Sequence, residues 1–581
     1  MKYTLVNKNY REDYVKNLVN ERGGDYNKLI HANKNDIAPP NLLDNIEEGA
    51  TLFKQNVLWK DDKKIVLIRD CDVDGETSSA IIYQYIKHLN PEKEVIAIGH
   101  SGKQHGLEDM TERILEMKDV SLVICPDAGS SDYQYHKQLK ESGIDTLCLD
   151  HHLADKYSED AIVINNQLSP QYKNKDLTGA GVAYQFCRFL DEQLESCFSD
   201  ELVDLAALGI ISDMGSVLSL ENMAIITFGL NKTNKNPLFQ ALLDKQDYSM
   251  GGVISPMTVA FYITPLINGL IRVGSYEEKE KLFQALIDGN KIVPSTKRGD
   301  KGNTEILSCQ VARDCTNARA RQNRIKDKAL EDIEMRIEKD GLASNKILTI
   351  VLDDERDNFP PELNGLVAMQ CASKYKKPTM VLRENDEGYL RGSIRGLSNS
   401  ELKSFKDYLE STKLCEYVQG HNNAAGCSLK ASNLEKLHEL ANKQLSEYDF
   451  ENDSYEVNFV REANSTDLSA IIKDIDNNKE LFGQGNPTPL LAVNDICIPR
   501  ANVQIIGKNK DTIKFEKNDI VYMIFKASWE TLQKFTGWAI GDKDEVNLCI
   551  VGEANENFFN GKETSQIFIK DFNIEDTRFS F

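Results

Sequence analysis

The chain has 581 residues, a net charge of −22 and twelve cysteines. Its length excludes a single hydrophobic core and fits three or four domains. No apolar run approaches the length of a membrane span and the first residues lack a signal-peptide core, so we expect a cytoplasmic protein without a membrane partner. The cysteines form no CxxC pair and several lie in apolar runs, which indicates reduced core residues rather than metal ligands or disulfides.

The first part of the chain predicts a parallel sheet. Its short β-branched runs are separated by stretches able to form helices, such as residues 76–89, as in consecutive βαβ units. Open sheets of this kind bind ligands outside the carboxyl ends of their strands. The runs are KKIVLIRD, EVIAIG, SLVICPD, DTLCLD and AIVINN.

Four acidic motifs follow one another in this region, and three of them come directly after a predicted strand. So many carboxylates on one rim would repel each other unless cations neutralised them. Oxygen ligands with one imidazole suit Mn²⁺ or Mg²⁺ better than structural Zn²⁺, and paired ions commonly serve displacement at phosphorus. The pattern predicts phosphoester hydrolysis. The motif residues are Asp70, Asp72, Asp74, Asp127, Asp150, His151, His152 and Asp213.

Each motif alone has a plainer interpretation. The string at residues 70–75 also fits a calcium-type loop or a simple turn. His151 and His152 also fit a pair of core or surface histidines. Four acidic motifs in strand-end register favour the metal cluster over these alternatives.

The motifs resemble those of the DHH phosphoesterase superfamily, and the rest of the chain resembles its RecJ branch, the single-strand-specific 5′→3′ DNA exonucleases. The phosphate-binding and C-terminal segments select RecJ within the superfamily. The segments that carry this resemblance are LTGAGVAYQF (177–186), PLINGLIR (265–272), RGSIR (391–395), QGHNNAAG (419–426), LFGQGNPTPLL (481–491) and FNGKETSQIFIKDF (559–572).

The resemblance implies an α/β protein of four parts. A DHH parallel-sheet domain would occupy residues 1–300 and a connecting helix residues 301–341. A smaller DHH-associated α/β domain would follow at 342–450, and an OB-fold-like β-barrel for nucleic acid at 455–581.

The resemblance also implies roles for individual residues. The ligands of two divalent ions, Mn²⁺ or alternatively Mg²⁺, would be Asp72, Asp74, Asp127, His151 and Asp213. Catalytic residues that orient these ligands or contact the scissile phosphate would be Asp70, Asp150 and His152. Residues that bind the strand, its 5′-terminal phosphate above all, would be His105, Arg272, Arg391, Ser393, Arg395, Gly420 and His421.

Some positions depart from the family. Ile68 stands where many DHH enzymes have a histidine ligand, and Gln419 stands where RecJ has glycine. The family's glycine-tyrosine-glycine turn reads Gln104-His105-Gly106, without the usual arginine before it, so Lys103 or His105 would have to replace that phosphate contact. Such altered loops suit a phage or prophage-borne copy.

The net charge argues against a DNA-tracking surface, although the metal site itself accounts for part of the acid. A basic run at residues 311–328 predicts a helix that either contacts DNA or is a solvated linker. In the C-terminal part Phe515, Phe525 and Phe568 fit either base-stacking platforms or, as period-two aromatics more often do, the core.

The expected function is a metal-dependent 5′→3′ exonuclease that degrades single-stranded DNA to 5′-mononucleotides in DNA repair and recombination. The alternatives are a DHH-type oligoribonuclease or cyclic-dinucleotide phosphodiesterase, and a non-catalytic replication scaffold of the same fold. The expected partners are single-stranded DNA and a helicase or single-strand-binding protein, and the chain is expected to be a monomer.

Overall fold

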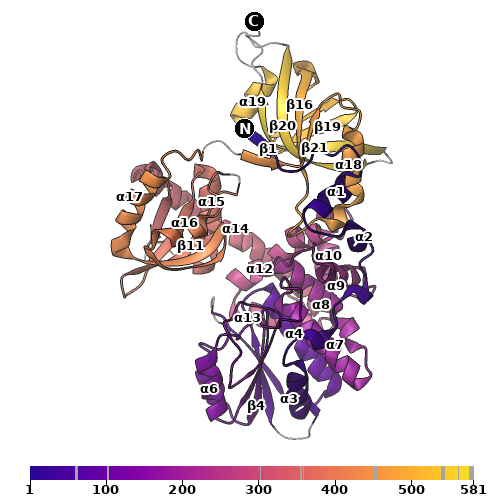
Figure 1. The fold of residues 1–581 in the computed structure, drawn as a ribbon, viewed down its shortest axis with the longest axis vertical. Coiled ribbons are helices and arrows are strands. Elements are labelled where there is room, and N and C mark those ends of the chain that lie inside the picture. The colour runs from indigo at the N-terminus through magenta and orange to yellow at the C-terminus, as the bar shows by residue number, and fades with distance from the viewer. Residues whose placement is uncertain are drawn as a thin grey trace. The chain divides into compact units, whose positions relative to one another are not determined.

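The protein forms two compact units in the computed structural model, and each is described by itself (Figure 1). The parallel-sheet unit contains Arg22–Gln322 and Glu480–Pro487. The other unit, called the two-sheet unit after its two larger sheets, contains Met1–Glu21, Asn323–Lys479 and Thr488–Phe581. The structure describes residues 1–58, 63–100, 104–300, 302–353, 356–357, 359–398, 400–450, 454–537, 544–559 and 562–574.

The five strands expected in the first part are confirmed, and they form a sheet of order β3-β2-β4-β5-β6 in which all neighbours are parallel. From β2 the chain crosses to β3 on one side and then to β4 on the other. The strand order therefore reverses between β2 and β4, where open α/β sheets bind ligands. The strands are β2 (Lys64–Arg69), β3 (Val95–Gly99), β4 (Val120–Pro126), β5 (Asp145–Asp150) and β6 (Ile162–Asn165).

Helices cover both faces of this sheet, which explains why its strands are apolar on both sides (Figure 1). On one face Ile114 of α5 and Leu139 of α6 join Val66 and Val123 in an apolar cluster. On the other face α3 packs closely, since a Cβ at Gly49 would lie 2.7 Å from Ile164. The helices of this unit include α3 (Ile46–Leu58), α4 (Val73–Leu89), α5 (Thr111–Leu115), α6 (Tyr133–Glu141), α7 (Gly179–Leu194), α8 (Val203–Ser212), α9 (Leu220–Asn231), α10 (Pro237–Met250), α12 (Thr264–Val273) and α13 (Tyr276–Asp288).

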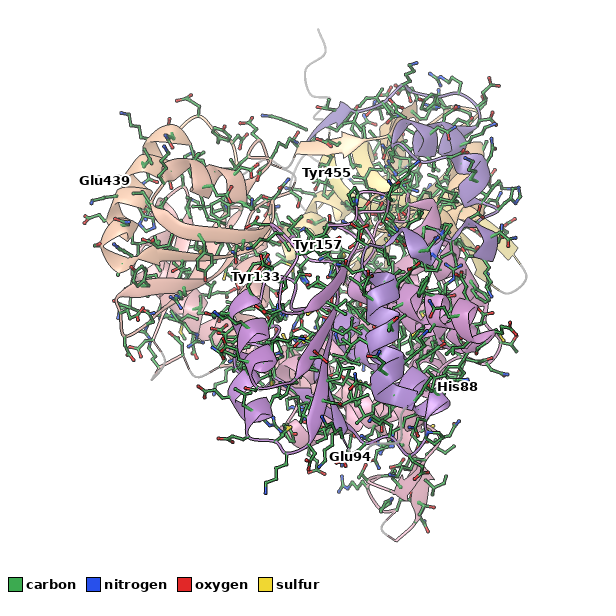
Figure 2. The ribbon with its side chains drawn as sticks, turned by 60° about the horizontal axis from the view of Figure 1, so that its bottom comes forward. His88, Glu94, Tyr133, Tyr157, Glu439 and Tyr455 are labelled. Atoms are coloured by element: carbon green, nitrogen blue, oxygen red, sulfur yellow. The ribbon has the colours of Figure 1, made fainter. Side chains whose placement is uncertain are left out.

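One connection differs from the expectation. Residues 151–161 join β5 to β6 without a helix. This loop is held instead by side chains, since Tyr133 donates to the carbonyl of Lys156 (3.0 Å) and Tyr157 to Asp44 (3.2 Å); both tyrosines are labelled in Figure 2.

The fourth acidic motif does not follow a strand. Its apolar run belongs to the buried helix α8, and Asp213 is the residue that ends this helix. A short apolar run cannot be assigned to strand or helix by periodicity when every side of it is buried. The expected strand-end register therefore holds for three motifs and is wrong for the fourth.

One helical stretch, Pro256–Val273, is long and apolar enough to cross a membrane by length and composition, contrary to the expectation from the sequence. Half of it is buried inside the protein. Ile267 and Leu270 of α12 are buried, whereas Arg272 lies in the last turn. A core helix of a large domain has the same composition, so the stretch is weak evidence for a membrane span.

The long helix expected at the basic run is α14 (Leu307–Lys339). Several of its cations are already paired with acids: Arg313 with Glu305 at 2.8 Å, and Arg321 with Glu278 at 2.8 Å. The linker interpretation therefore applies to much of the run. Arg319 differs, because it forms no salt bridge with any residue in the described ranges.

The first sheet of the two-sheet unit has the order β12-β13-β11-β10-β9. Only β9 and β10 are parallel, and the other pairs are antiparallel. Its elements are β9 (Leu348–Leu352), α15 (Asn364–Tyr375), β10 (Thr379–Glu384), β11 (Tyr389–Arg395), α16 (Phe405–Thr412), β12 (Cys415–His421), β13 (Ala424–Lys430) and α17 (Leu434–Gln444).

The second sheet is a mixed sheet of seven strands, β15-β16-β20-β21-β19-β18-β17, and contains the short strands expected near the end of the chain. Phe515 is 2% exposed and stacks on Tyr522, so it belongs to the core, whereas Phe525 is 54% exposed and contacts Phe568. The elements are β15 (Phe459–Glu462), α18 (Leu468–Asn477), β16 (Leu490–Pro499), β17 (Gln504–Ile506), β18 (Thr512–Lys517), β19 (Ile520–Ile524), α19 (Trp529–Thr536), β20 (Glu545–Phe559) and β21 (Lys562–Ile574).

The N-terminal segment packs with the C-terminal part of the chain. Strand β1 (Lys2–Leu5) pairs in parallel with β14 (Ser454–Val457), which places Met1–Glu21 in the two-sheet unit. The expected first domain, 1–300, thus has its first residues in the other unit, because a strand pairing between distant segments leaves no local signal. The four expected domain ranges otherwise stay a prediction.

Candidate active site

Three carboxylates meet where the strand order reverses. Asp70 follows β2, Asp72 is the N-cap of α4 and accepts from Gly75 N (2.9 Å), and Asp127 follows β4. One oxygen of each carboxylate lies within 4.8 Å of the other two. Asp127 has a φ of +65°, a left-handed conformation that is uncommon outside glycine and often found at functional sites.

A second group consists of Asp74, His151 and Asp213, whose ligand atoms also lie within 4.8 Å of one another. His151 joins the two groups, because its Nε2 lies 3.5 Å from Asp213 and 3.2 Å from Asp127. His152, Asp127 and His151 form a further group, whose ligand atoms also lie within 4.8 Å of one another. All five predicted metal ligands are therefore brought together at one rim of the parallel sheet.

The N-terminus of α7 fixes Asp74. The carboxylate accepts hydrogen bonds from the Thr178 hydroxyl (2.9 Å), Gly179 N (2.7 Å) and Ala180 N (3.1 Å). Unpaired N–H groups at the start of a helix favour a negative charge, so these contacts hold Asp74 in place and oppose the burial that raises its pKa.

Glycines leave the space that these carboxylates occupy. A Cβ at Gly179 would lie 2.3 Å from Asp127 Oδ1, and one at Gly209 would lie 2.4 Å from Asp74 Oδ1. Alanine at either position would have to displace a predicted ligand.

Asp150 orients both histidines of the DHH string. Its buried carboxylate accepts from the backbone N–H groups of His151 (2.7 Å), His152 (3.1 Å) and Ser130 (2.9 Å) and pairs with His152 Nδ1 at 2.8 Å. Burial alone would disfavour its charge, but His152, His151 and these hydrogen bonds together hold the pKa of Asp150 below its usual range. It is thus a negatively charged support behind the histidines.

Without bound cations, the remaining carboxylates repel one another. Burial, followed by the charges of its acidic neighbours, raises the pKa of Asp127 well above its usual value, and the same causes raise the pKa of Asp213 to about 8. Burial disfavours the charged form of His152, but its contact with Asp150 outweighs this and raises its pKa to about 9.

The donor set fits divalent cations. Buried oxygens of Asp70 and Asp127 form no hydrogen bond with any residue that the structure describes. The neighbouring donors are carboxylates and imidazoles, which suit Mn²⁺ and Mg²⁺. Ile68 is fully buried in β2 and adds no nitrogen. Asp70 and His152, which were expected only to support the ligands, also belong to the groups of side chains that could hold an ion.

His105 lies next to Asp70, with Nδ1 2.7 Å from Oδ2, although its side chain is 59% exposed. The hydrogen bond to Asp70 is the main reason that the pKa of His105 is raised to about 11. Cys71 Sγ lies 3.9 Å from the imidazole of His105. Lys103, the other candidate in this loop, lies outside the described residues.

Arg272 and Arg319 form a positive region in the parallel-sheet unit. Burial, followed by the charge of Arg319, lowers the pKa of Arg272. The helices that carry them pack closely, since a Cβ at Gly269 would lie 3.1 Å from the Cα of Arg319. Neither arginine forms a salt bridge with any residue in the described ranges, as suits a site for an external anion.

The remaining predicted residues lie in the two-sheet unit, where the structure brings them together on one sheet. Arg395 pairs across the strands with Ala424, which pairs with His421, and Ser393 is joined to Gln419 through Gly426 in the same way. Residues directly opposite one another share a face of the sheet, so Ser393, Arg395 and His421 share one face.

Small residues keep that face accessible. Ala424 and Gly426 lie on β13, between β11 and β12, and a Cβ at Gly365 of α15 would lie 2.5 Å from an Arg395 nitrogen. Gly420 has a φ of +129°, a conformation that disfavours any other residue. Arg391 is exposed on the same face as Ser393.

Sequence reasoning did not assign roles to several supporting residues. The only signal for Thr178 and Gly179 was the motif LTGAG. The loop after Asp213 is supported from far along the chain, since Val217 N donates to Gln484 O (2.9 Å) and a Cβ at Gly485 would lie 2.4 Å from the Ser216 hydroxyl. The segment LFGQGNP thus supports the fourth motif.

Family models match two parts of the chain. The model of the DHH family, N-terminal domain, matches residues 64–210, and the model of the RecJ OB domain matches residues 465–571. These ranges contain the parallel sheet with most of the carboxylate cluster and most of the seven-stranded sheet.

Similar proteins match nearly the whole chain. The SPbeta prophage-derived protein YorK of Bacillus subtilis is 36% identical over 100% of this chain and 99% of its own length. The single-stranded-DNA-specific exonuclease RecJ of the same organism is 27% identical over 94% of this chain and 65% of that protein. The crystal structure of RecJ from Thermus thermophilus in complex with Mn²⁺ has the same fold, with a TM-score of 0.68 and 20% identity over 91% of this chain and 72% of that one. A match of this extent to YorK, together with the DHH and RecJ OB matches, shows that this chain belongs to the RecJ family of DHH phosphoesterases.

Proposed function

We propose that this protein is a divalent-metal-dependent exonuclease that hydrolyses single-stranded DNA in the 5′→3′ direction and releases 5′-mononucleotides. The observation that carries the proposal is the meeting of Asp70, Asp72 and Asp127 with Asp74, His151 and Asp213 at one rim of the parallel sheet. Family membership gives this cluster its substrate class. The RecJ OB domain argues against the smaller DHH enzymes that act on oligoribonucleotides or cyclic dinucleotides.

Two divalent ions are proposed, with Mn²⁺ preferred and Mg²⁺ as the alternative. Asp72, Asp74, Asp127, His151 and Asp213 would hold them, and Asp127 is best placed to bridge the two because it belongs to two of the ligand groups and a carboxylate has two oxygens. Bound ions of this kind supply hydroxide near neutral pH and neutralise charge on the phosphoryl oxygens.

The protein's own groups position the reaction. Asp150 holds His151 in place for its ligand role and keeps His152 protonated at neutral pH. His152 is 55% exposed, so its imidazolium is available to the scissile phosphate. Asp70 orients the ligands beside it, and Thr178 with the start of α7 holds Asp74 in place.

Polarity of digestion would come from cationic groups that recognise the 5′ end. We assign this role to Arg272, Ser393 and Arg395, because guanidinium groups bind phosphate oxygens bidentately. Further contacts to the strand are assigned to His105, Arg391, Gly420 and His421.

We also propose the substrate, the partners, the location and the oligomeric state of the enzyme. Single-stranded DNA is the substrate, and a helicase or single-strand-binding protein would supply it. A cytoplasmic monomer is proposed, since half of the apolar helical stretch is buried in the protein.

The decisive assay uses end-labelled single strands and blunt duplexes, each with and without a 5′-phosphate, in Mn²⁺ or Mg²⁺. We expect mononucleotides from single strands only, and none after chelation. Asp127→Ala and His151→Ala should abolish hydrolysis while the fold is kept. An active Asp127→Ala variant would refute the metal assignment, and release of label from the 3′ end would refute the direction.

A further inference from the structure

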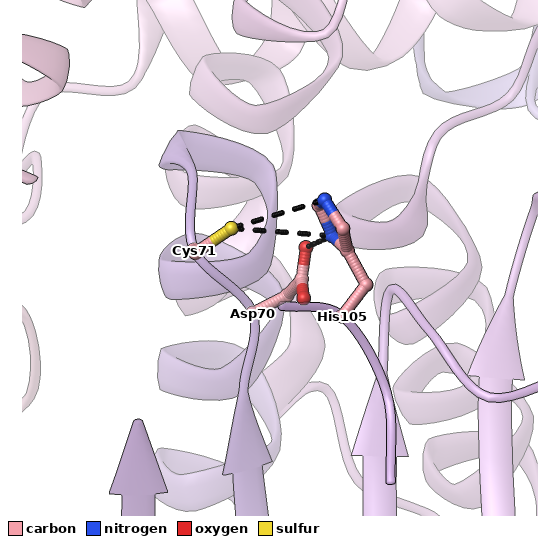
Figure 3. Close-up of side chains that lie close together, drawn as sticks. All are labelled: Asp70, Cys71 and His105. Atoms are coloured by element: carbon pink, nitrogen blue, oxygen red, sulfur yellow. Dashed lines mark hydrogen bonds and ion pairs between the residues drawn. The ribbon is translucent and has the colours of Figure 1, made fainter. Parts of the chain in front are cut away.

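A thiol, an imidazole and a carboxylate lie together beside the carboxylate cluster, as Figure 3 shows for Asp70, Cys71 and His105. Cys71 Sγ lies 3.9 Å from His105 Nε2 and 4.0 Å from Nδ1, and Nδ1 lies 2.7 Å from Asp70 Oδ2. One ligand atom of each residue lies within 4.8 Å of the other two. These separations are those of groups that can share one ion.

The three groups come from two segments of the parallel-sheet unit. Asp70 and Cys71 form the short link between β2 and α4. His105 precedes Gly106, whose φ is +67° and whose added Cβ would lie 2.2 Å from Asp132. Asp70 is 2% exposed, Cys71 is partly buried and the His105 side chain is 59% exposed, so an ion from solution can reach the group.

The donor chemistry separates this group from the neighbouring centre. Thiolate, imidazole and carboxylate oxygen are the ligands of Zn²⁺ and similar borderline-soft ions, whereas the neighbouring ligand groups contain only carboxylates and imidazoles. Three protein ligands with a fourth position open to solvent are a common arrangement for Zn²⁺ in enzymes.

We propose that Asp70, Cys71 and His105 form an additional cation site that takes Zn²⁺ or another thiophilic divalent ion and that an ion there inhibits the nuclease. The thiol of Cys71 and the imidazolium of His105 each lose a proton to solvent when the ion binds. Inhibition follows from Asp70, which belongs both to this group and to the group with Asp72 and Asp127. Its carboxylate cannot keep one position for both kinds of ion.

Binding can be measured without reference to activity, with Co²⁺ as a spectroscopic substitute for Zn²⁺. The full chain is first freed of metal by chelator and dialysis. Added Co²⁺ should then give a near-ultraviolet thiolate-to-cobalt charge-transfer band, which carboxylate and imidazole ligands alone do not produce. Cys71→Ser should lose the band, and His105→Asn should weaken it. Cys309→Ser changes an exposed cysteine elsewhere and should keep the band.

Inhibition is tested by titrating Zn²⁺ into the Mn²⁺-supported exonuclease reaction. Cys71→Ser should need about tenfold more Zn²⁺, or still more, for half inhibition than the unaltered chain does. Its thermal unfolding and its Mn²⁺-supported rate without Zn²⁺ verify that the fold and the main centre are intact. Absence of the band in the unaltered chain, or its persistence in Cys71→Ser, would overturn the site. Equal Zn²⁺ sensitivity of the two proteins would overturn the inhibitory role. Both readouts differ from loss of hydrolysis, which would instead count against the proposed function.

Discussion

Asp127 shows at the scale of one residue why an ion site costs stability when no ion is bound. It is 2% exposed, and four acidic neighbours raise its pKa together with burial. An acid whose pKa is higher in the folded protein than in the unfolded chain makes folding less favourable at any pH where the unfolded chain would ionise it. The destabilisation is therefore absent below pH about 4, the value for an unfolded aspartate, and grows as the pH rises towards the folded pKa.

Asp127→Asn should therefore stabilise the metal-free protein while it removes catalysis. With chelator present, its Tm at pH 8 should exceed that of the unaltered chain by a few degrees, and the difference should shrink towards pH 5. Added Mn²⁺ should raise the Tm of the unaltered chain much more than that of the variant. The matched control is Glu305→Gln, because Arg313 pairs with Glu305 at 2.8 Å and holds its pKa below the usual range, so its loss should lower the Tm. A lower Tm for Asp127→Asn at pH 8 would contradict the repulsion argument.

His152 should set the alkaline limit of activity. Its contact with Asp150 raises its pKa to about 9, so the charge and the stability that it provides are complete below pH about 6.5 and are lost as the pH rises through about 9. His152→Gln should lower kcat about 10-fold to 10²-fold at pH 7.5, as expected for one charged hydrogen bond, and should lack the alkaline decline. The pH profile of kcat tests this. His88→Gln is the control, because His88 stacks on Phe198 at 3.9 Å and should keep the normal profile.

At the scale of elements, two helices leave space for functional side chains through a glycine. Gly179 begins α7 against Asp127, and Gly365 lies in α15 against Arg395. Alanine is a better helix former than glycine, so it should favour each helix and yet displace the side chain that lies against it. The same substitution therefore tests two different sites.

Gly179→Ala should weaken Mn²⁺ activation about 10-fold to 10²-fold, the effect that loss of ligand support commonly has. Its preference for 5′-phosphorylated strands should be unchanged. Gly365→Ala should give the opposite pattern, with normal Mn²⁺ activation and a reduced 5′-phosphate preference. Titrations of Mn²⁺ against rate, on strands with either 5′ end, measure both quantities. Identical behaviour of the two variants would show a general loss of structure and not two distinct supports.

Elements that depend on local pattern could be predicted from the sequence. The strands before Asp70, Asp127 and Asp150 are continuous apolar runs followed by an acid, and the structure confirms them. Asp213 was predicted as a site residue although its helix was mistaken for a strand, since the fully buried α8 has no polar face.

Contacts between distant segments could not be predicted in this way. The pairing of β1 with β14 and the support of the Asp213 loop by Gln484 join residues hundreds of positions apart. The thiol beside His105 was also missed, because Cys71 was read with the core cysteines. Only the fold shows that it lies next to an imidazole from another loop.

At the scale of the whole molecule, a net charge of −22 must be reconciled with a polyanionic substrate. Six aspartates of the cluster account for part of it, and two divalent ions would neutralise four of those charges. Many basic residues of α14 are paired with acids, which leaves Arg272 and Arg319 as a local positive region. We therefore expect the protein to attract the DNA strand only near these arginines and the bound ions. Positive charge is concentrated there, and each phosphate that it neutralises releases counterions.

Arg395 provides the test of polarity for the whole molecule. Loss of a charged partner of a desolvated phosphate commonly costs about 2 to 5 kcal/mol, so Arg395→Ala should reduce kcat/KM on 5′-phosphorylated strands far more than on 5′-hydroxyl strands. Mn²⁺ activation should be unchanged, because no predicted metal ligand is altered. Arg391→Ala removes the same charge four positions earlier, from an exposed site on the same face, and should slow both substrates to a similar and smaller extent. An unchanged ratio between the two substrates in Arg395→Ala would remove Arg395 from the 5′-phosphate site, and with it the physical basis for the direction of digestion.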